Sequence, residues 1–309
     1  MDSLRLFAPA TVANVACGFD IFGLAVDNPG DEVVLRRRAD DRIVITEITG
    51  DQGKLPLDPE KNTVSLPILR YLEHLNIQAG FDIALHKKMP LGSGLGSSSA
   101  SSVAGVYAVN QLLGNPLPTQ DLLPFAMEGE RVACGSAHAD NVAPALLGGF
   151  VVVRSYNPLD IFRVPTPPDL YVTLLHPDIE VNTKDARFIL RQEISLKKGI
   201  AQMGNVAGLI AGLIQADYDL IGRSMIDYLI EPVRSILIPH FFEVKAAALE
   251  AGALGCSISG AGPSLFAFSK GEETAHRVAK AMQAVYGPTS IAATPYVSAV
   301  NTQGPRILD

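Results

Sequence analysis

The sequence predicts an α+β protein with two domains. The chain has 309 residues, of which 48% are hydrophobic, enough for a large buried core. Strand-like and helix-like segments follow one another without the strict strand–helix–strand rhythm of a parallel α/β fold. A proline-rich segment without periodicity, residues 155–169, is the best candidate for a domain boundary. We therefore expect one domain over residues 1–155 and a second over residues 156–309.

Alternating apolar and polar residues predict four strands in the first half, because successive side chains of a strand point to opposite faces. These strands are residues 4–7, 32–38, 42–48 and 81–86. Apolar spacings of three and four residues predict helices at residues 63–75, 98–113 and 122–133. Gly114 and Pro116 supply the stop signal of the second helix.

Buried strands are predicted where the sequence is apolar and β-branched, at residues 148–154 and 170–175. The second half then alternates between helices and short strands. The predicted helices are residues 183–191, 194–215, 218–229, 241–251 and 272–286, and the predicted strands are residues 255–258, 265–269 and 290–295.

Charge and cysteine content exclude several functional classes. The net charge is −7, so no broad basic field attracts nucleic acid or an anionic membrane. The most apolar helix-like stretch, residues 206–216, is shorter than the roughly 20 residues that span a bilayer. Cys17, Cys134 and Cys256 stand far apart without metal-ligand spacing, which favours a reducing compartment. We expect a soluble cytoplasmic protein without nucleic-acid or membrane partners.

The most informative motif is PLGSGLGSSSASSVA, residues 90–104, in which three glycines and a run of serines stand at the start of a predicted helix. Gly92, Gly94 and Gly96 allow the backbone to lie against a ligand with its N–H groups turned inward. The unsatisfied N–H groups and the positive dipole end of the helix face the same loop. This arrangement predicts a phosphate-binding site.

Other glycine motifs fit this segment less well. No lysine follows the glycines as in the GK-[ST] phosphate loop, and the third glycine of the dinucleotide-binding pattern is absent. The chain also has no GxSxG nucleophile elbow. A purely structural glycine turn before a helix stays open on the GxGxG pattern alone.

Two further glycine-containing segments accompany the central loop: APATVANVACGFD at residues 8–20 and SISGAGPSLFAF at residues 257–268. The three segments, in this order and spacing, resemble the GHMP kinases across essentially the whole chain. The resemblance implies an N-terminal domain with a left-handed βαβ element and a ferredoxin-like C-terminal domain. ATP and a small acceptor would bind between them.

The resemblance also implies an ATP site and a magnesium site. The central loop would wrap the triphosphate, and Asn62 would lie near the adenine. Ser98 and Glu130 would hold Mg²⁺, which agrees with its preference for a carboxylate, hydroxyl and phosphate oxygens; a solvated helix-face carboxylate is the alternative for Glu130. The expected ATP-binding residues are Asn62, Pro90, Leu91, Gly92, Ser93, Gly94, Leu95, Gly96, Ser97, Ser98, Ser99 and Ala100.

Within that family the chain resembles the branch that phosphorylates L-homoserine. The sugar and mevalonate branches usually carry a catalytic aspartate where this chain has Asn141, and many carry lysine where it has Thr11. An asparagine cannot accept a proton, so Asn141 would orient the hydroxyl, and the γ-phosphate or water would take the proton. With Asn141, the expected catalytic residues are Glu130 and Ser98.

Homoserine is a zwitterion, so its site must neutralise a carboxylate and hold an ammonium group. Arginine suits the first task and a carboxylate the second. Arg187 and Arg234 match the carboxylate-binding positions of that branch, although a lone arginine is more often a surface cation. The other expected substrate-binding residues are Asn14, Asp20, His138, Asp140 and Gly260.

Two alternatives stay open at this point. One is a GHMP kinase for another small alcohol, such as mevalonate or shikimate. The other is a non-catalytic nucleotide-binding regulator of the same fold. The resemblance also implies a possible homodimer.

Overall fold

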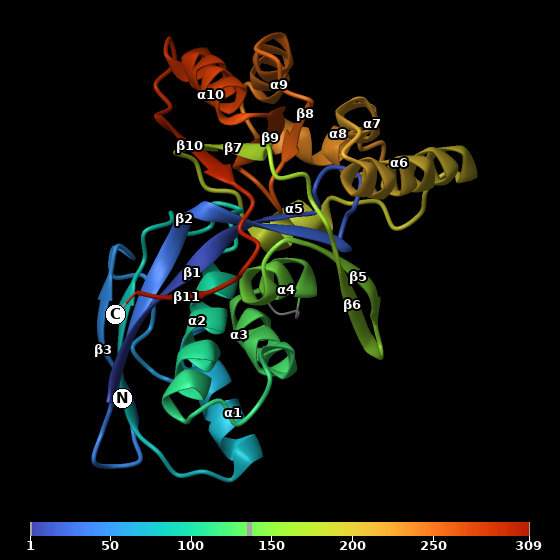
Figure 1. The fold of residues 1–309 in the computed structure, drawn as a ribbon. Helices are drawn as coiled ribbons and strands as arrows, with labels where there is room; N and C mark the ends of the chain where they lie inside the picture. Colours follow the sequence, from blue (N-terminus) through green and yellow to red (C-terminus); the bar gives the residue numbers. More distant parts are fainter. Residues whose placement is uncertain (1, 135–137, 309) are drawn as a thin grey trace.

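The computed structural model describes residues 2–134 and 138–308. Its chain builds two sheets, one of seven strands and one of four, each covered by helices (Figure 1). The mixed α+β composition is as predicted.

The first sheet carries the N-terminal half and takes back the C-terminal end. Its strands follow the order β11-β1-β2-β4-β3, and β5 pairs with β2 and with β6. Strands β3 and β4 pair in parallel and are joined by α1, which forms a βαβ element; its left-handed crossover stays a prediction. The bounds are β1 (Ser3–Ala13), β2 (Phe22–Arg37), β3 (Ile43–Thr49), α1 (Leu66–Leu75), β4 (Phe81–His86), β5 (Phe150–Tyr156), β6 (Leu159–Val164) and β11 (Arg306–Ile307).

Helices α2 (Ser97–Leu112), α3 (Leu123–Cys134) and α4 (Ala139–Leu147) pack with α1 beside this sheet (Figure 1). A short 3-10 turn, η1 (Thr119–Leu122), precedes α3. Helix α2 is buried on nearly all sides, and its small residues allow neighbours to approach closely. A Cβ added at Gly105 would lie 2.0 Å from the Val64 carbonyl oxygen. The central helix is therefore held firmly, which fixes the position of its N-terminus.

The second sheet has the strand order β10-β7-β9-β8 with antiparallel pairing. In chain order, helices connect its first strand to its second and its third to its fourth, which gives the predicted ferredoxin-like arrangement. The elements are β7 (Leu170–Pro177), α5 (Thr183–Phe188), α6 (Leu196–Gln215), α7 (Tyr218–Ser224), α8 (Glu231–Arg234), η2 (Ser235–Leu237), α9 (Phe241–Glu250), β8 (Gly255–Ile258), β9 (Leu265–Lys270), α10 (Glu272–Tyr286) and β10 (Ala293–Ala299).

Several predicted elements have the expected bounds, including β4, β8 and α10. Others were wrong in extent: the strands predicted at 4–7, 32–38 and 290–295 are Ser3–Ala13, Phe22–Arg37 and Ala293–Ala299. The predicted helix 218–229 ends at Ser224, because the Asp227 carboxylate accepts the backbone N–H groups of Leu229 and Glu231 and turns the chain into α8. The segment 155–169 is not an irregular linker, since it contains β6 paired with β5.

Helix α4 was missed because Pro144 lies inside it and two glycines follow it, which together read as a loop. The pairing of β6 extends the first sheet to Val164. The division into two domains at residue 155 stays a prediction.

No helix among the described residues is both long and apolar enough to cross a bilayer. Within the same residues Cys17 and Cys256 are buried free thiols.

Candidate active site

The glycine-rich loop has the conformation that its sequence predicts. Gly92, Gly94 and Gly96 have φ angles of 64°, 77° and 69°. Helix α2 begins directly after Gly96, and no side chain caps its N-terminus. The first backbone N–H groups of a helix lack intrahelical partners, so this end of α2 offers donors to an anion.

The three glycine-containing segments meet at this loop. Thr11 N–H donates to the Leu95 carbonyl at 3.0 Å, and Ser264 N–H donates to the Ser93 carbonyl at 3.1 Å. The Ser259 hydroxyl donates to the Gly94 carbonyl at 2.7 Å. A Cβ at Gly94 would come within 2.5 Å of the Ser259 carbonyl oxygen, so only glycine fits this approach. The three segments that carry the family resemblance therefore lie together in space.

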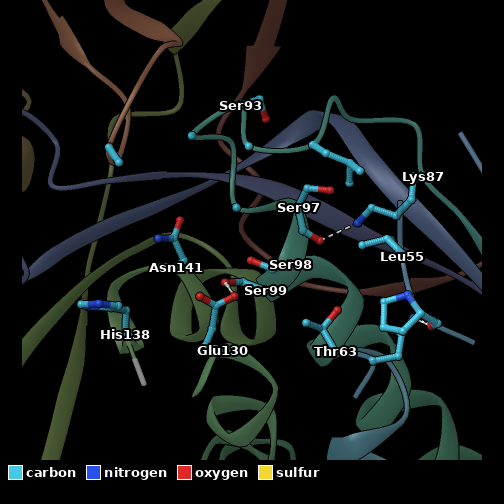
Figure 2. A pocket seen from close by; sticks show the side chains of 18 of the residues that line it. Leu55, Thr63, Lys87, Ser93, Ser97, Ser98, Ser99, Glu130, His138 and Asn141 are labelled. Atoms are coloured by element: carbon cyan, nitrogen blue, oxygen red, sulfur yellow. Dashed lines mark hydrogen bonds between the residues drawn. The ribbon is translucent and has the colours of Figure 1, made fainter. Parts of the chain in front are cut away.

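A cavity of about 420 Å³ lies over the loop and the start of α2 (Figure 2). Its walls come from the loop before α1, from the glycine-rich loop, and from α3, α4 and the 257–268 segment. The lining residues are Leu55, Pro56, Lys61, Asn62, Thr63, Lys87, Leu91, Gly92, Ser93, Gly94, Gly96, Ser97, Ser98, Ser99, Glu130, His138, Asn141, Gly260 and Ala261.

Most of the predicted ATP-binding residues line this cavity, and three do not. Leu95 and Ala100 are fully buried beneath the loop. Pro90 stands at the start of the loop, outside the lining. Asn62 lines the cavity, but its side chain also closes its own turn, donating to the Pro56 carbonyl at 2.7 Å and accepting from Val64 N–H at 3.0 Å.

The surroundings of Ser93 and Glu130 indicate whether the cavity fits a polyphosphate and a hard cation. The Ser93 hydroxyl is buried without a hydrogen-bond partner among the described residues, as expected where a ligand supplies one. Glu130 is 3% exposed, and Ser99 rather than Ser98 donates to its Oε1, at 2.8 Å. The Ser98 side chain faces the same space (Figure 2).

The oxygen donors of Ser98 and Glu130 suit Mg²⁺, which usually takes one or two carboxylates and completes its shell with phosphate and water. Among the described residues no cluster of three His, Cys, Asp or Glu residues is arranged to hold a metal ion. A cation in this cavity would thus depend on oxygens of the bound phosphates.

Asn141 lines the cavity from the first turn of α4. The Thr11 hydroxyl donates to Asn141 Oδ1 at 2.7 Å, which directs the donating end of the amide away from Thr11. A Cβ at Gly96 would lie 2.0 Å from the Thr11 oxygen and 3.0 Å from Asn141 Oδ1. Thr11 therefore fixes the Asn141 amide close to the phosphate loop.

A charged cluster adjoins the cavity beyond Asn141. Asp20 accepts hydrogen bonds from both Nη atoms of Arg187. Arg234 is 3% exposed and donates to the Gly260 carbonyl at 3.1 Å. Both guanidinium groups lie over the Phe19 ring, at 5.5 Å and 5.1 Å from its centroid. The structure thus brings together two arginines that are 47 positions apart in the sequence.

The loop that supplies Asp20 is strained and tied to the same cluster. Asn14, Val15, Ala16 and Asp20 all have positive φ angles, which are uncommon for residues with side chains. Asn14 Oδ1 accepts the Asp20 N–H at 2.9 Å, and Asn14 Nδ2 donates to the Gly260 carbonyl at 2.8 Å. These bonds hold the Asp20 carboxylate beside Arg187.

His138 and Asp140 complete the cluster at the start of α4. Burial lowers the pKa of His138, whose Nδ1 lies 3.9 Å from Asp20 Oδ1. Burial and the charges of Asp20 and Glu130 raise the pKa of Asp140 to about 7. Asp140 Oδ1 has no hydrogen-bond partner among the described residues. A buried carboxyl group with one unpartnered oxygen is a candidate for binding a cationic ligand group.

The sequence did not predict Lys87 and Asp31 as residues of the site. Lys87 lines the cavity and forms a buried ion pair with Asp31 of β2. The two residues are 56 positions apart, and no motif connects them. The available signal was a lysine shortly before the glycine-rich loop.

Comparisons with known proteins agree with this geometry. Residues 62–149 match the family described as GHMP kinases N terminal domain, and residues 209–287 match GHMP kinases C terminal. The fold and the site define a GHMP kinase.

The more similar relatives narrow this class. Curated homoserine kinases of Chlorobium phaeobacteroides (strain BS1) and Chlorobaculum tepidum are each 51% identical to this chain, with 100% of it and 100% and 99% of the relatives covered. A crystal structure of homoserine kinase from Cytophaga hutchinsonii matches with a TM-score of 0.98 and 62% identity over 100% of this chain and 98% of that one. The chain belongs to the GHMP kinases, in the group of the homoserine kinases.

The likeness extends in fold alone to more distant kinases. Mevalonate kinase of L. major, solved with R-mevalonate, is 14% identical with a TM-score of 0.72, and the match covers 95% of each chain.

Proposed function

We propose that this chain transfers the γ-phosphoryl group of ATP to the side-chain hydroxyl of L-homoserine, which forms O-phospho-L-homoserine for threonine biosynthesis. One observation carries the proposal: an anion-binding helix N-terminus opens into a cavity that is lined by His138, and His138 also stands 3.9 Å from Asp20 in the adjoining cluster of paired opposite charges. The helix N-terminus suits a triphosphate, and the charged cluster suits a zwitterion.

ATP would lie along the cavity with its phosphates on the glycine-rich loop. The backbone N–H groups at the start of α2 and the Ser93 hydroxyl would contact phosphate oxygens. Ser98 and Glu130 would hold Mg²⁺, which supplies charge neutralisation of the phosphates when bound. Asn62 and its neighbours Leu55 and Pro56 would border the adenine.

The acceptor would replace an internal ion pair by two pairs of its own. Without substrate, Arg187 and Asp20 bind one another. The homoserine carboxylate would bind Arg187 and Arg234, and the ammonium group would bind Asp20, Asp140 and neutral His138. Because each charge keeps a partner throughout, the exchange avoids leaving an isolated charge in a partly buried site.

Asn141 would then direct the acceptor hydroxyl. Its Oδ1 is occupied by Thr11, so its amide N–H groups would donate to the hydroxyl oxygen and hold it toward the γ-phosphate. In the transfer, a bond forms between this oxygen and phosphorus and the bond to the ADP oxygen breaks. The hydroxyl proton passes to a phosphoryl oxygen or to water, because an asparagine side chain cannot accept it.

A turnover assay tests the proposal. We expect ADP release that needs Mg²⁺ and L-homoserine together, with O-phospho-L-homoserine as the product. Mevalonate and shikimate should give only background, because neither carries an ammonium group for the Asp20 cluster. Turnover of either alcohol at the homoserine rate, or nucleotide binding without turnover of any acceptor, would overturn the assignment.

Asp140 gives the proposal a pH signature. With its pKa raised to about 7, this carboxyl takes up a proton as the pH falls below 7 and then cannot pair with the substrate ammonium. We expect the KM for homoserine to rise as the pH falls from 8 to 6, and Asp140→Asn to give a high KM with a flatter profile. KM measured over this range checks the prediction, and an unchanged profile in the variant would contradict it.

The same substitution should stabilise the fold at pH 8. Because the pKa of Asp140 is raised in the folded state, the contribution of this group to stability is fully present below pH 3.8. That contribution is lost as the pH rises from 3.8 through about 7. The neutral amide of the Asp140→Asn variant would avoid this loss, worth about 2–4 kcal/mol. Thermal unfolding of the variant and the parent at pH 5 and pH 8 measures the difference, which should be clearly larger at the higher pH.

We also propose a homodimer and a cytoplasmic location. The dimer is supported by the outer face of α6, where Leu196, Ile200, Met203 and Ile214 are exposed at heptad-like spacing. Antiparallel packing against α6 of a second copy would place Lys197 and Lys198 near Asp217 and Asp219. Sedimentation should show a dimer for the parent and a monomer for Ile200→Glu. A monomeric parent would contradict the proposed dimer.

A further inference from the structure

Two adjacent lysines after β4 have different surroundings. Lys88 is half-exposed and pairs with the largely buried Glu32, which also pairs with Arg5. The Lys87 side chain is 2% exposed. Its ammonium group reaches the first turn of α2 and pairs with Asp31 of β2. A buried lysine beside an anion-binding loop invites assignment as a phosphate ligand, so its hydrogen bonds decide its role.

All three N–H groups of the Lys87 ammonium have acceptors within the protein. They donate to the Asp31 carboxylate, to the Ser97 carbonyl at 2.7 Å and to the Ser101 hydroxyl at 2.8 Å. An ammonium group has three donors. Lys87 therefore has none left for a phosphate oxygen in this arrangement, although its side chain lines the cavity (Figure 2).

Asp31, which is fully buried, ties together both ends of the glycine-rich loop. Its Oδ1 accepts the backbone N–H groups of Lys88 and Met89 at 2.8 Å and 3.0 Å, just before the loop. Its Oδ2 accepts the Ser97 hydroxyl at 2.8 Å, where the loop enters α2. One carboxylate thus fixes the span of the loop.

The cost of this arrangement is a negative charge buried beside a site for a polyanion. In a medium of low polarity such a carboxylate repels a phosphate chain more strongly than it would in water. Ser97, which contacts Asp31, also lines the cavity, so the two charges would be close.

We propose that Lys87 is a positioning residue that neutralises Asp31 and does not itself bind phosphate. Its ammonium group cancels the buried carboxylate, so that Asp31 clamps both ends of the loop without repelling the ligand. The inference rests on the proposed function only for the identity of that ligand as a nucleotide triphosphate.

The test compares three variants by calorimetric binding of tripolyphosphate and of a non-hydrolysable ATP analogue. Lys87→Met leaves Asp31 unpaired, and we expect affinity for both anions to fall at least about tenfold. The double variant Asp31→Asn/Lys87→Met removes both charges and should recover to within about threefold of the parent. Asp31→Asn alone leaves a positive charge near the anion and should bind no more weakly than the double variant.

Three results would overturn the inference. A double variant as weak as Lys87→Met would make Lys87 a direct phosphate ligand. An Asp31→Asn variant as weak as Lys87→Met would make the pair a mechanical clamp without an electrostatic role. Equal loss of binding of adenosine, which carries no phosphate, would show general damage to the cavity.

Lys88→Met is the matched control, because it removes the neighbouring surface lysine and should leave anion binding unchanged. Thermal unfolding of every variant identifies loss of folding. If Lys87→Met does not fold, the double variant Asp31→Asn/Lys87→Met, which has no unpaired charge, carries the test. Homoserine turnover by the parent is measured separately. A parent that binds tripolyphosphate but has no kinase activity would contradict the proposed function and leave this inference standing.

Discussion

Replacing Glu130 by Gln should lower kcat by about 10³-fold while the KM for homoserine changes little, since metal neutralisation of transferring phosphates contributes several kcal/mol. The substitution is nearly isosteric, and the amide oxygen can still accept the Ser99 hydroxyl that now lies 2.8 Å from Oε1. What it removes is the negative charge of a residue that is 3% exposed and faces the same cavity as Ser98. Steady-state kinetics at several Mg²⁺ concentrations measure the effect.

Glu128→Gln provides the control for this experiment. Glu128 lies on the same helix and pairs with Arg131 at the surface, so its replacement should leave kcat unaltered. Unfolding curves of both variants exclude a loss of folded enzyme. A Glu130→Gln enzyme with normal kcat and an unchanged Mg²⁺ requirement would remove Glu130 from the metal site.

The second large effect concerns the acceptor carboxylate. Arg187→Ala and Arg234→Ala should each raise the KM for homoserine by about 10²-fold, the usual scale for losing a charge-assisted pair in a partly buried site. The KM for ATP should stay within about threefold, because neither arginine lines the nucleotide cavity. Arg187 is the cleaner test, since its side chain is 46% exposed and Arg234 also supports the backbone at Ala186 and Gly260.

An acceptor that lacks the carboxylate sharpens this test. The parent should strongly prefer homoserine to 3-amino-1-propanol, and the preference should largely disappear in Arg187→Ala. Arg191→Ala, in the same exposed segment, serves as the control and should keep the preference. Unaltered KM values for homoserine in both arginine variants would refute the acceptor site.

Local sequence signals predicted the glycine-rich loop and the helix behind it because these depend on neighbouring residues. Glycines at alternate positions favour positive φ angles, and the apolar spacing after Ser98 defines the helix. For the same reason the bounds of α10 and β4 followed from periodicity. Helix α4 was not predicted, because a proline such as Pro144 removes a backbone hydrogen bond and locally indicates a helix break.

Pairings between distant residues could not be derived from local patterns. The Thr11–Asn141 hydrogen bond, the Asp20–Arg187 ion pair and the Lys87–Asp31 pair each depend on how the sheets bring separate segments together. The arginines were found only through family resemblance, which supplied positions but not contacts. That resemblance also named Ser98 beside Glu130, whereas the hydrogen bond to Glu130 comes from Ser99.

A crystal structure with a non-hydrolysable ATP analogue, Mg²⁺ and L-homoserine would test the account most directly. We predict the β- and γ-phosphates against the backbone N–H groups that follow Gly96, with Mg²⁺ between them and the oxygens of Ser98 and Glu130. The homoserine carboxylate should lie on Arg187 and Arg234, with the Asp20–Arg187 pair opened. Nucleotide bound at another place, with the start of α2 blocked by protein atoms, would contradict the account.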